Sequence, residues 1–217
     1  MKHVKQIFSI LLLIVLLGNL TVTAQKSQGE LAAEELVTLG ILAGDEEGNL
    51  LLSKTVTRAE MAVIVCRLLA LEDVAVKTKV LTPSFSDVPT THWAAGYIEI
   101  VKAQGIINGY PDGSFCPEKE VSYVEVLKML ITSCGYLPKA NSMGGYPGGV
   151  MAVSMQNGIT KGVAFEQNSP ATRADVACFV LRTLDLPILL QTGYGVSEEY
   201  QLDPEVTLRS QNFKEQP

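Results

Sequence analysis

The sequence has few of the residues from which enzymes and metal centres build their sites. It contains two histidines, of which only His92 lies beyond the first 24 residues, and its four cysteines form no Cys-x-x-Cys pair. Zinc sites need such clusters, so we predict no metal site. Glycine-rich phosphate loops and nucleophile motifs are also missing, which leaves only carboxylates as candidate catalytic groups. Because helix caps and solvated faces account for these acids, we predict a non-catalytic protein without a cofactor.

Positive charge is scarce as well. The chain has 17 Lys and Arg residues against 23 Asp and Glu residues, which gives a net charge of −6. Nucleic acids and anionic membranes attract proteins mainly through their phosphates, so an acidic chain is a poor partner for either. We therefore expect no nucleic-acid partner, and any acidic ligand must meet a local cluster of positive charge.

Long apolar runs are confined to the start of the chain. A basic stretch, MKHVKQ, precedes the apolar IFSILLLIVLLGNL, and the small residues Val22 and Ala24 follow. This order predicts a secretory signal peptide over residues 1–24. Its unbroken apolar core, Ile10–Leu17, is shorter than the roughly 20 residues that span a bilayer. We expect an exported protein without membrane contact after cleavage; the alternative is an uncleaved anchor.

The four cysteines are Cys66, Cys116, Cys134 and Cys178. Export permits disulfides, but the chain is long enough to bury a core without them. Three of the four lie in apolar helical runs, where a free cysteine behaves as a small hydrophobic residue. We expect buried thiols, and the spacing leaves a disulfide open.

An internal repeat organises the rest of the chain. A Gly-Ile-x-x-Gly motif begins at Gly40, Gly105 and Gly158, and a tetrapeptide follows 17, 17 and 14 residues later as TRAE (57–60), SYVE (122–125) and TRAD (172–175). Each copy predicts a helix, a loop and a second helix with an apolar stripe. Two helices alone cannot bury such a stripe, so we expect the three copies to form one pseudo-threefold domain.

The tetrapeptides allow two interpretations. Thr57 and Glu60 fit a capping box, which satisfies the first backbone N–H groups of a helix. Capping asks nothing of the second position, which is Arg58 in the first copy, Tyr123 in the second and Arg173 in the third. Free N–H groups and a guanidinium could together bind an acidic ligand. The alternative is a solvated arginine that pairs with a nearby glutamate.

The middle copy adds a resemblance. Its segments FSDVP (85–89), HWA (92–94) and GIINGYPDGSF (105–115) closely resemble an S-layer homology repeat, and the two weaker copies extend the resemblance over roughly residues 28–188. The resemblance implies an all-α fold in which three helix-loop-helix repeats surround a central three-helix bundle. We expect a signal peptide (1–24), repeats at 28–80, 81–140 and 141–188, and a polar tail (189–217).

The resemblance also implies a function. Such modules bind exported proteins non-covalently to secondary cell-wall polysaccharide that bears pyruvylated sugars, through grooves between repeats. When the family's ligand-binding positions are carried over to this sequence, they fall on Arg58, Arg173, Trp93 and Asp87. Packing is the alternative role for Trp93, and a turn or helix cap is the alternative for Asp87. Because Tyr123 replaces an arginine, at most two grooves are equipped.

We therefore expect a secreted protein of the cell wall or cell surface whose partner is cell-wall polysaccharide. The alternative is an envelope module of the same fold that has lost polysaccharide binding and contacts another envelope protein. The tail, residues 189–217, favours that alternative, since we expect no further domain after the repeats. Its polar sequence predicts a loosely ordered segment or one short extended stretch.

Overall fold

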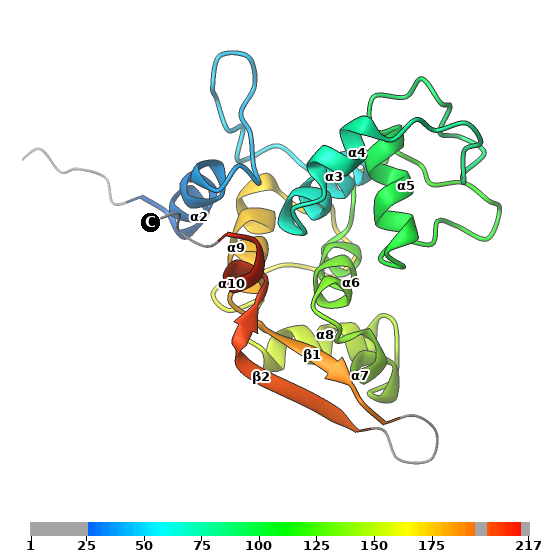
Figure 1. Cartoon of the computed structure of the whole chain (residues 1–217). Helices are drawn as coiled ribbons and strands as arrows, with labels where there is room; N and C mark the ends of the chain where they lie inside the picture. The colour runs from blue at the N-terminus through cyan, green and yellow to red at the C-terminus, as the bar shows by residue number, and fades with distance from the viewer. Residues whose placement is uncertain (1–25, 194–198, 214–217) are drawn as a thin grey trace, which may run out of the picture.

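The computed structural model describes residues 26–193 and 199–213, so the predicted signal peptide lies outside the described residues. The fold is mostly helical, in agreement with the predicted all-α class, and adds one two-stranded sheet that the sequence analysis did not predict (Figure 1). No described helix has both the length and the apolar character needed to cross a membrane. The elements are α2 (Gln28–Thr38), α3 (Arg58–Leu68), α4 (Glu72–Lys77), α5 (Ala95–Ala103), α6 (Tyr123–Ser133), α7 (Leu137–Ser142), α8 (Gly148–Gln156), α9 (Arg173–Leu184), β1 (Pro187–Gln191), β2 (Tyr200–Thr207) and α10 (Leu208–Asn212).

The helices α3, α6 and α9 begin at the repeated tetrapeptides, as predicted. Thr57 accepts the Glu60 N–H and the Glu60 carboxylate accepts the Thr57 N–H, which is a complete capping box. Ser122 and Glu125 form the same box at the start of α6. At α9 the hydroxyl of Thr172 accepts the Asp175 N–H, but the Asp175 carboxylate does not accept the Thr172 N–H in return. Local sequence therefore sets where each of these helices starts.

The apolar stripes of α3, α6 and α9 meet in the core. Contacts join α3 to α6 and α6 to α9. Burying these stripes removes apolar surface from water, which is the main favourable term in folding. The predicted stripes comprise nine residues, of which Leu69 is partly buried and the others are fully buried: Met61, Val65, Val126, Leu130, Cys134, Val176, Val180 and Leu184.

The first helix of each repeat packs against a neighbouring repeat. The contacts pair α5 with α3, α8 with α6 and α2 with α9, so each partner belongs to a different repeat (Figure 1). Gly29 permits the pairing of α2 with α9, because a Cβ atom there would lie 2.8 Å from the Cβ atom of Ala174. The repeats are thus completed by their neighbours and do not fold as separate hairpins.

A closed ring of backbone hydrogen bonds joins the three segments that precede α3, α6 and α9. The N–H of Val56 donates to the Ala171 oxygen (3.0 Å), that of Ala171 to Val121 (2.9 Å), and that of Val121 back to Val56 (2.9 Å). All three residues are fully buried. Every repeat therefore gives one hydrogen bond to the ring and receives one.

The C-terminal segment is more ordered than the sequence analysis predicted. Strands β1 and β2 pair in antiparallel fashion, and α10 follows. The hairpin is anchored because Leu189 donates its N–H to Cys134 at the end of α6 (2.9 Å). At α10, Arg209 forms ion pairs with Glu35 and Asp185. These long-range contacts order a sequence whose local signals are weak.

The cysteines are free thiols in the structure. Cys66, Cys134 and Cys178 are buried, as expected, and Cys116 is partly exposed. Burial raises the pKa of the Cys66 and Cys134 thiols to about 12. Thiols with such pKa values are unreactive at neutral pH, because the thiolate is the nucleophile.

Candidate functional site

The two arginines of the tetrapeptides lie where one repeat meets the next. The first two N–H groups of α3, on Arg58 and Ala59, donate to backbone oxygens in the loop of the second repeat. The N–H groups of Arg173 and Ala174 donate in the same way to the loop of the first repeat. The expectation that free N–H groups at these helix starts attract an anion is therefore wrong, because the neighbouring loop uses them.

One pocket, of about 370 Å³, brings Arg173 and Trp93 together. We call it the Arg173 pocket; loop residues 41–45, Asn49 and Leu51 also line it, as does Glu60 of α3. Trp93 is 59% exposed, so its indole is a surface platform and does not belong to the core. His92 stacks beside it, with ring centroids 5.7 Å apart. Three repeats thus contribute to one pocket.

Arg173 is held in place without being neutralised. Its Nε donates to the Leu50 oxygen (2.8 Å) and its Nη2 to the Ala43 oxygen (2.7 Å). Two other cations line the same pocket. Lys54 lies 3.5 Å from Glu60, and Arg67 pairs with Glu72. Of these three, only Arg173 lacks a carboxylate partner among the residues that the structure describes.

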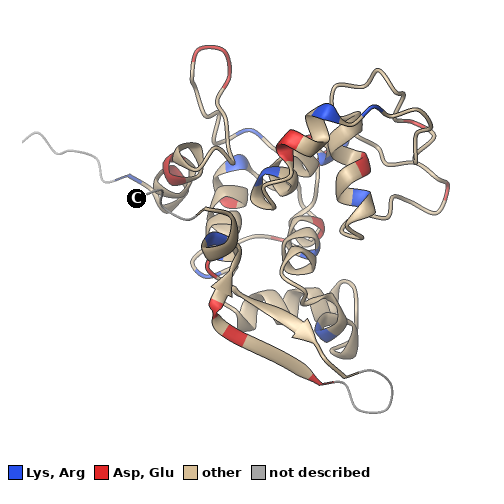
Figure 2. Cartoon of the chain, viewed as in Figure 1, with Lys and Arg blue, Asp and Glu red and all other residues tan. Residues whose placement is uncertain are grey.

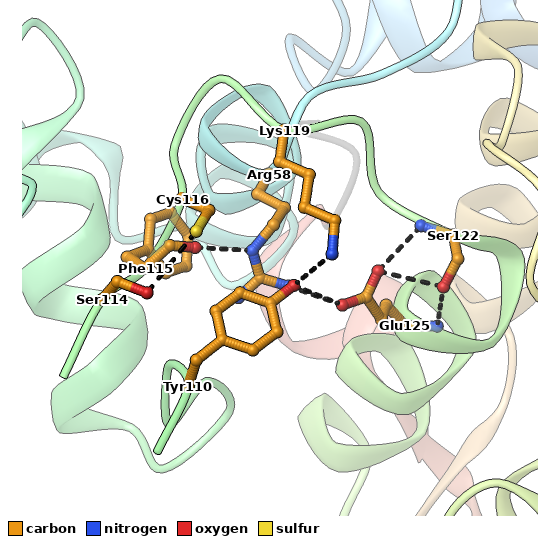
Figure 3. A network of polar contacts seen from close by, with 8 residues as sticks. All are labelled: Arg58, Tyr110, Ser114, Phe115, Cys116, Lys119, Ser122 and Glu125. Carbon is orange, nitrogen blue, oxygen red and sulfur yellow. Dashed lines mark hydrogen bonds and ion pairs between the residues drawn. The ribbon is translucent and has the colours of Figure 1, made fainter. Parts of the chain in front are cut away.

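A second pocket, of about 190 Å³, contains Arg58 and is called the Arg58 pocket. Here the arginine is only 5% exposed. Its Nε donates to the Phe115 oxygen (2.7 Å) and its Nη1 to the Glu125 carboxylate (2.9 Å). The rings of Tyr110 and Phe115 lie 4.8 and 4.7 Å from its central carbon, and Figure 3 shows Tyr110 beside the guanidinium. Arg58 is thus a buried link between two repeats.

Opposing effects act on the pKa of Glu125. Burial pushes this pKa up. The backbone N–H of Ser122, the charge of Arg58 and the hydroxyls of Ser122 and Tyr110 push it further down, so the pKa lies below its ordinary value. Figure 3 shows these groups around the carboxylate. Glu125 therefore stays ionised and neutralises Arg58.

The two pockets use equivalent positions of the repeat. Phe115 and Leu50, whose oxygens accept from the two arginines, each lie seven residues before a helix cap. Trp93 and Tyr146 occupy matching places before α5 and α8, and each lines one pocket. The two pockets are therefore two versions of one arrangement. In the Arg173 pocket, a guanidinium without a carboxylate partner among the described residues shares the lining with the exposed ring of Trp93.

Comparison with known proteins agrees with this geometry. Residues 26–62 and 84–126 match the S-layer homology domain family. The chain contains S-layer homology repeats. The matched regions end within the first turns of α3 and α6, so each includes one of the tetrapeptides that begin these helices.

Named relatives are proteins of bacterial cell surfaces. The chain is 30% identical over 190 residues to the "Middle cell wall protein" of Brevibacillus brevis, and the aligned region covers 87% of this chain and 18% of that protein. The "Surface layer protein" of Brevibacillus choshinensis is 30% identical over 194 residues (87% and 17%). The "Cellulosome-anchoring protein" of Acetivibrio thermocellus is 45% identical over 71 residues (32% and 15%). The chain thus spans less than a fifth of each relative, and the family and relatives indicate a secreted protein of the cell wall or cell surface.

Asp87 lies near the start of the second S-layer homology repeat and holds its loop. Its two carboxylate oxygens accept the N–H groups of Phe115 and Cys116, both at 2.7 Å. Cys116 has a left-handed backbone conformation (φ 57°), which side chains disfavour and which these bonds help to maintain. Asp87 thereby positions the Phe115 oxygen that accepts from Arg58, so its contacts here are internal. A direct ligand contact stays a prediction.

The seam between the second and third copies of the internal repeat is filled by aromatic rings. Tyr123, which replaces the arginine, donates its hydroxyl to Asp175 (2.5 Å). Its ring stacks on Phe165 with centroids 4.7 Å apart, and Phe179 meets both rings edge-on. This seam thus lacks the arginine that the other two have.

Sequence reasoning missed several residues of these pockets. Tyr110, Lys128 and Tyr146 line the Arg58 pocket, and none of them was a candidate site residue. For Tyr146 a signal existed in the sequence, since it lies two residues before α8 just as Trp93 lies two residues before α5. Within the described residues, no group of three or more His, Cys, Asp or Glu side chains is placed to hold a metal ion.

Proposed function

We propose that the protein is a non-catalytic module that binds secondary cell-wall polysaccharide through a pyruvylated sugar in the Arg173 pocket. One observation carries this proposal: an unpaired guanidinium and an exposed indole, from different repeats, line the same pocket. Pyruvate that is attached to a sugar as a ketal keeps its own carboxylate free, and a carboxylate suits the planar donors of arginine. The apolar face of a sugar ring suits an indole.

The surroundings of Arg173 favour binding further. Two backbone oxygens already orient the guanidinium, so little side-chain freedom is lost when a ligand arrives. The whole chain carries a net charge of −6, and Figure 2 shows acidic and basic residues interspersed along it. A local, preoriented cation is therefore the means by which this acidic protein attracts an acidic ligand.

The proposed architecture is a pseudo-threefold domain of three S-layer homology repeats at residues 28–80, 81–140 and 141–188. The ring of hydrogen bonds through Val56, Val121 and Ala171 supports it. So does the cyclic packing of α2, α5 and α8 on α9, α3 and α6. In this arrangement Arg173 and Trp93 contact the ligand, whereas Arg58 and Asp87 hold the seam of the second pocket.

The test uses purified walls of the producing bacterium, before and after chemical removal of the secondary polysaccharide. We expect the protein to sediment with intact walls and to stay in solution with stripped walls. Arg173→Ala and Trp93→Ala should each weaken binding roughly tenfold or more, the value of one charge-assisted contact. Lys139→Ala removes a charge that lines neither pocket and serves as the control. Equal retention by stripped walls would instead indicate a peptidoglycan or protein partner.

A further inference from the structure

The sequence contains two Asn-Gly pairs, Asn108-Gly109 and Asn157-Gly158. In such a pair the asparagine side chain is prone to lose its amide, because glycine has no side chain to shield its backbone nitrogen. That nitrogen attacks the side-chain carbonyl carbon, its proton passes through water to the departing ammonia, and a cyclic succinimide forms. Water then opens the ring to give aspartate or isoaspartate. The reaction therefore consumes nothing but water.

The structure restrains the pair at the end of α8. The side-chain amide of Asn157 donates to the Val153 oxygen (2.8 Å), and the N–H of Gly158 donates to the Met155 oxygen (3.0 Å). Both hydrogen bonds must open before the glycine nitrogen can reach the side chain. Asn157 is also only partly exposed. We therefore expect a slow reaction at this pair.

The other pair has neither restraint. Asn108 is exposed and lies in the loop after α5, outside any helix or strand. Over residues 26–193 and 199–213, no hydrogen bond engages its side chain or the N–H of Gly109. The amide and the attacking nitrogen are thus both free to move, and water reaches them.

The fold requires the glycine of this unrestrained pair. Gly109 has a left-handed backbone conformation (φ 69°), and a Cβ atom there would lie 2.4 Å from the ring of Phe85. A larger residue, whose side chain would hinder the attack, therefore does not fit at this position. The reactive dipeptide is a consequence of the packing of this loop.

We propose that Asn108 is a site of spontaneous deamidation that loosens the seam between the first two repeats as the protein ages. Asn108 and Glu125 line the same pocket, so a new carboxylate adds negative charge near an ionised one. Isoaspartate also lengthens the backbone by one methylene just before Gly109 and Tyr110. The Tyr110 ring covers Arg58, and its hydroxyl donates to Glu125 (3.1 Å). Displacing this ring exposes a largely buried ion pair to water, which weakens it.

Peptide mapping by mass spectrometry tests the chemistry. The purified protein is incubated in mildly alkaline buffer, which speeds removal of the backbone proton, and the conversion of each pair is followed in the same sample. Asn108 should convert roughly tenfold faster than Asn157 or more, because two hydrogen bonds restrain Asn157. In concentrated urea, which unfolds the chain, the two rates should become similar, because both asparagines precede glycine.

Thermal unfolding of the aged protein tests the effect on the seam. Aged protein should melt at a lower temperature than fresh protein. Asn108→Gln, whose longer side chain forms the ring far more slowly, should keep its melting temperature after the same incubation. Asn157→Gln is the matched control and should lose stability on ageing as the unmodified protein does. Asn108→Asp adds the charge without the extra methylene, so fresh Asn108→Asp should melt between fresh and aged protein.

Several results would overturn the proposal. Equal conversion of Asn108 and Asn157 in the folded protein would show that the hydrogen bonds do not control the reaction. A ratio of rates that persists in urea would assign the difference to neighbouring sequence and not to the fold. Full conversion of Asn108 with an unchanged melting temperature would show that the seam does not depend on this loop.

Discussion

Arg58 and Arg173 occupy the same position of the same motif but have different surroundings in the structure. Both begin a central helix, and both donate Nε to an equivalent backbone oxygen, at 2.7 and 2.8 Å. The difference arises in the loop of the next repeat. Tyr110 covers Arg58 in the second repeat, whereas the equivalent position of the first repeat is Asp45 and has no ring. A motif therefore identifies a position, and its neighbours decide whether that position is structural or open to a ligand.

The largest expected effect separates the two arginines by stability. Arg58→Ala should lower the free energy of unfolding by about 3–5 kcal/mol, because it leaves the partly buried Glu125 without its partner. Arg173→Ala loses two bonds to backbone oxygens at a more exposed site and should cost roughly 1–2 kcal/mol. Urea unfolding measures both values.

The control for this comparison removes both charges of the pair. Arg58→Met combined with Glu125→Gln should recover part of the stability lost in Arg58→Ala, because no unpaired buried charge remains. Equal losses for Arg58→Ala and Arg173→Ala would mean that the two seams are structurally equivalent, and the distinction drawn between them would be wrong.

The third seam offers a smaller and more local test. Tyr123→Phe keeps the stack on Phe165 and removes only the bond to Asp175, so it should cost about 1.5–3 kcal/mol, the value of a hydrogen bond to a charged group. Binding to intact walls should not change, because this seam carries no arginine. Thermal unfolding and wall sedimentation give the two readouts, and weaker binding with unchanged stability would contradict a purely structural seam.

The smallest effect concerns acid. The pKa of Glu125 lies below its ordinary value of 4.5, so the folded state binds fewer protons there than the unfolded state. The resulting stability is complete above pH 4.5 and is lost as the pH falls through the lowered pKa. Glu125→Gln should therefore flatten the loss of stability below pH 4.5. Since other carboxylates remain, the curve should flatten only in part, and an unchanged slope would count against the pairing with Arg58.

Much of the helical framework could be predicted from the sequence. The capping residues Thr57 and Ser122 and the apolar stripes act within one or two turns of chain, so their signals are local. The pairing of α2 with α9, near opposite ends of the chain, has no such signal. The C-terminal hairpin was missed for the same reason, because its order depends on contacts with Cys134 and Glu35.

The candidate site shows the same division. The sequence by itself determined the helix starts, the repeat and the positions of Arg58, Arg173 and Trp93. Only the tertiary structure decided that Trp93 and Arg173 line one pocket, that Arg58 is enclosed with Glu125, and that Lys128 lies beside Tyr146. The physical reason is that each pocket forms where different repeats meet, so the environment of a charge depends on residues far away in the chain.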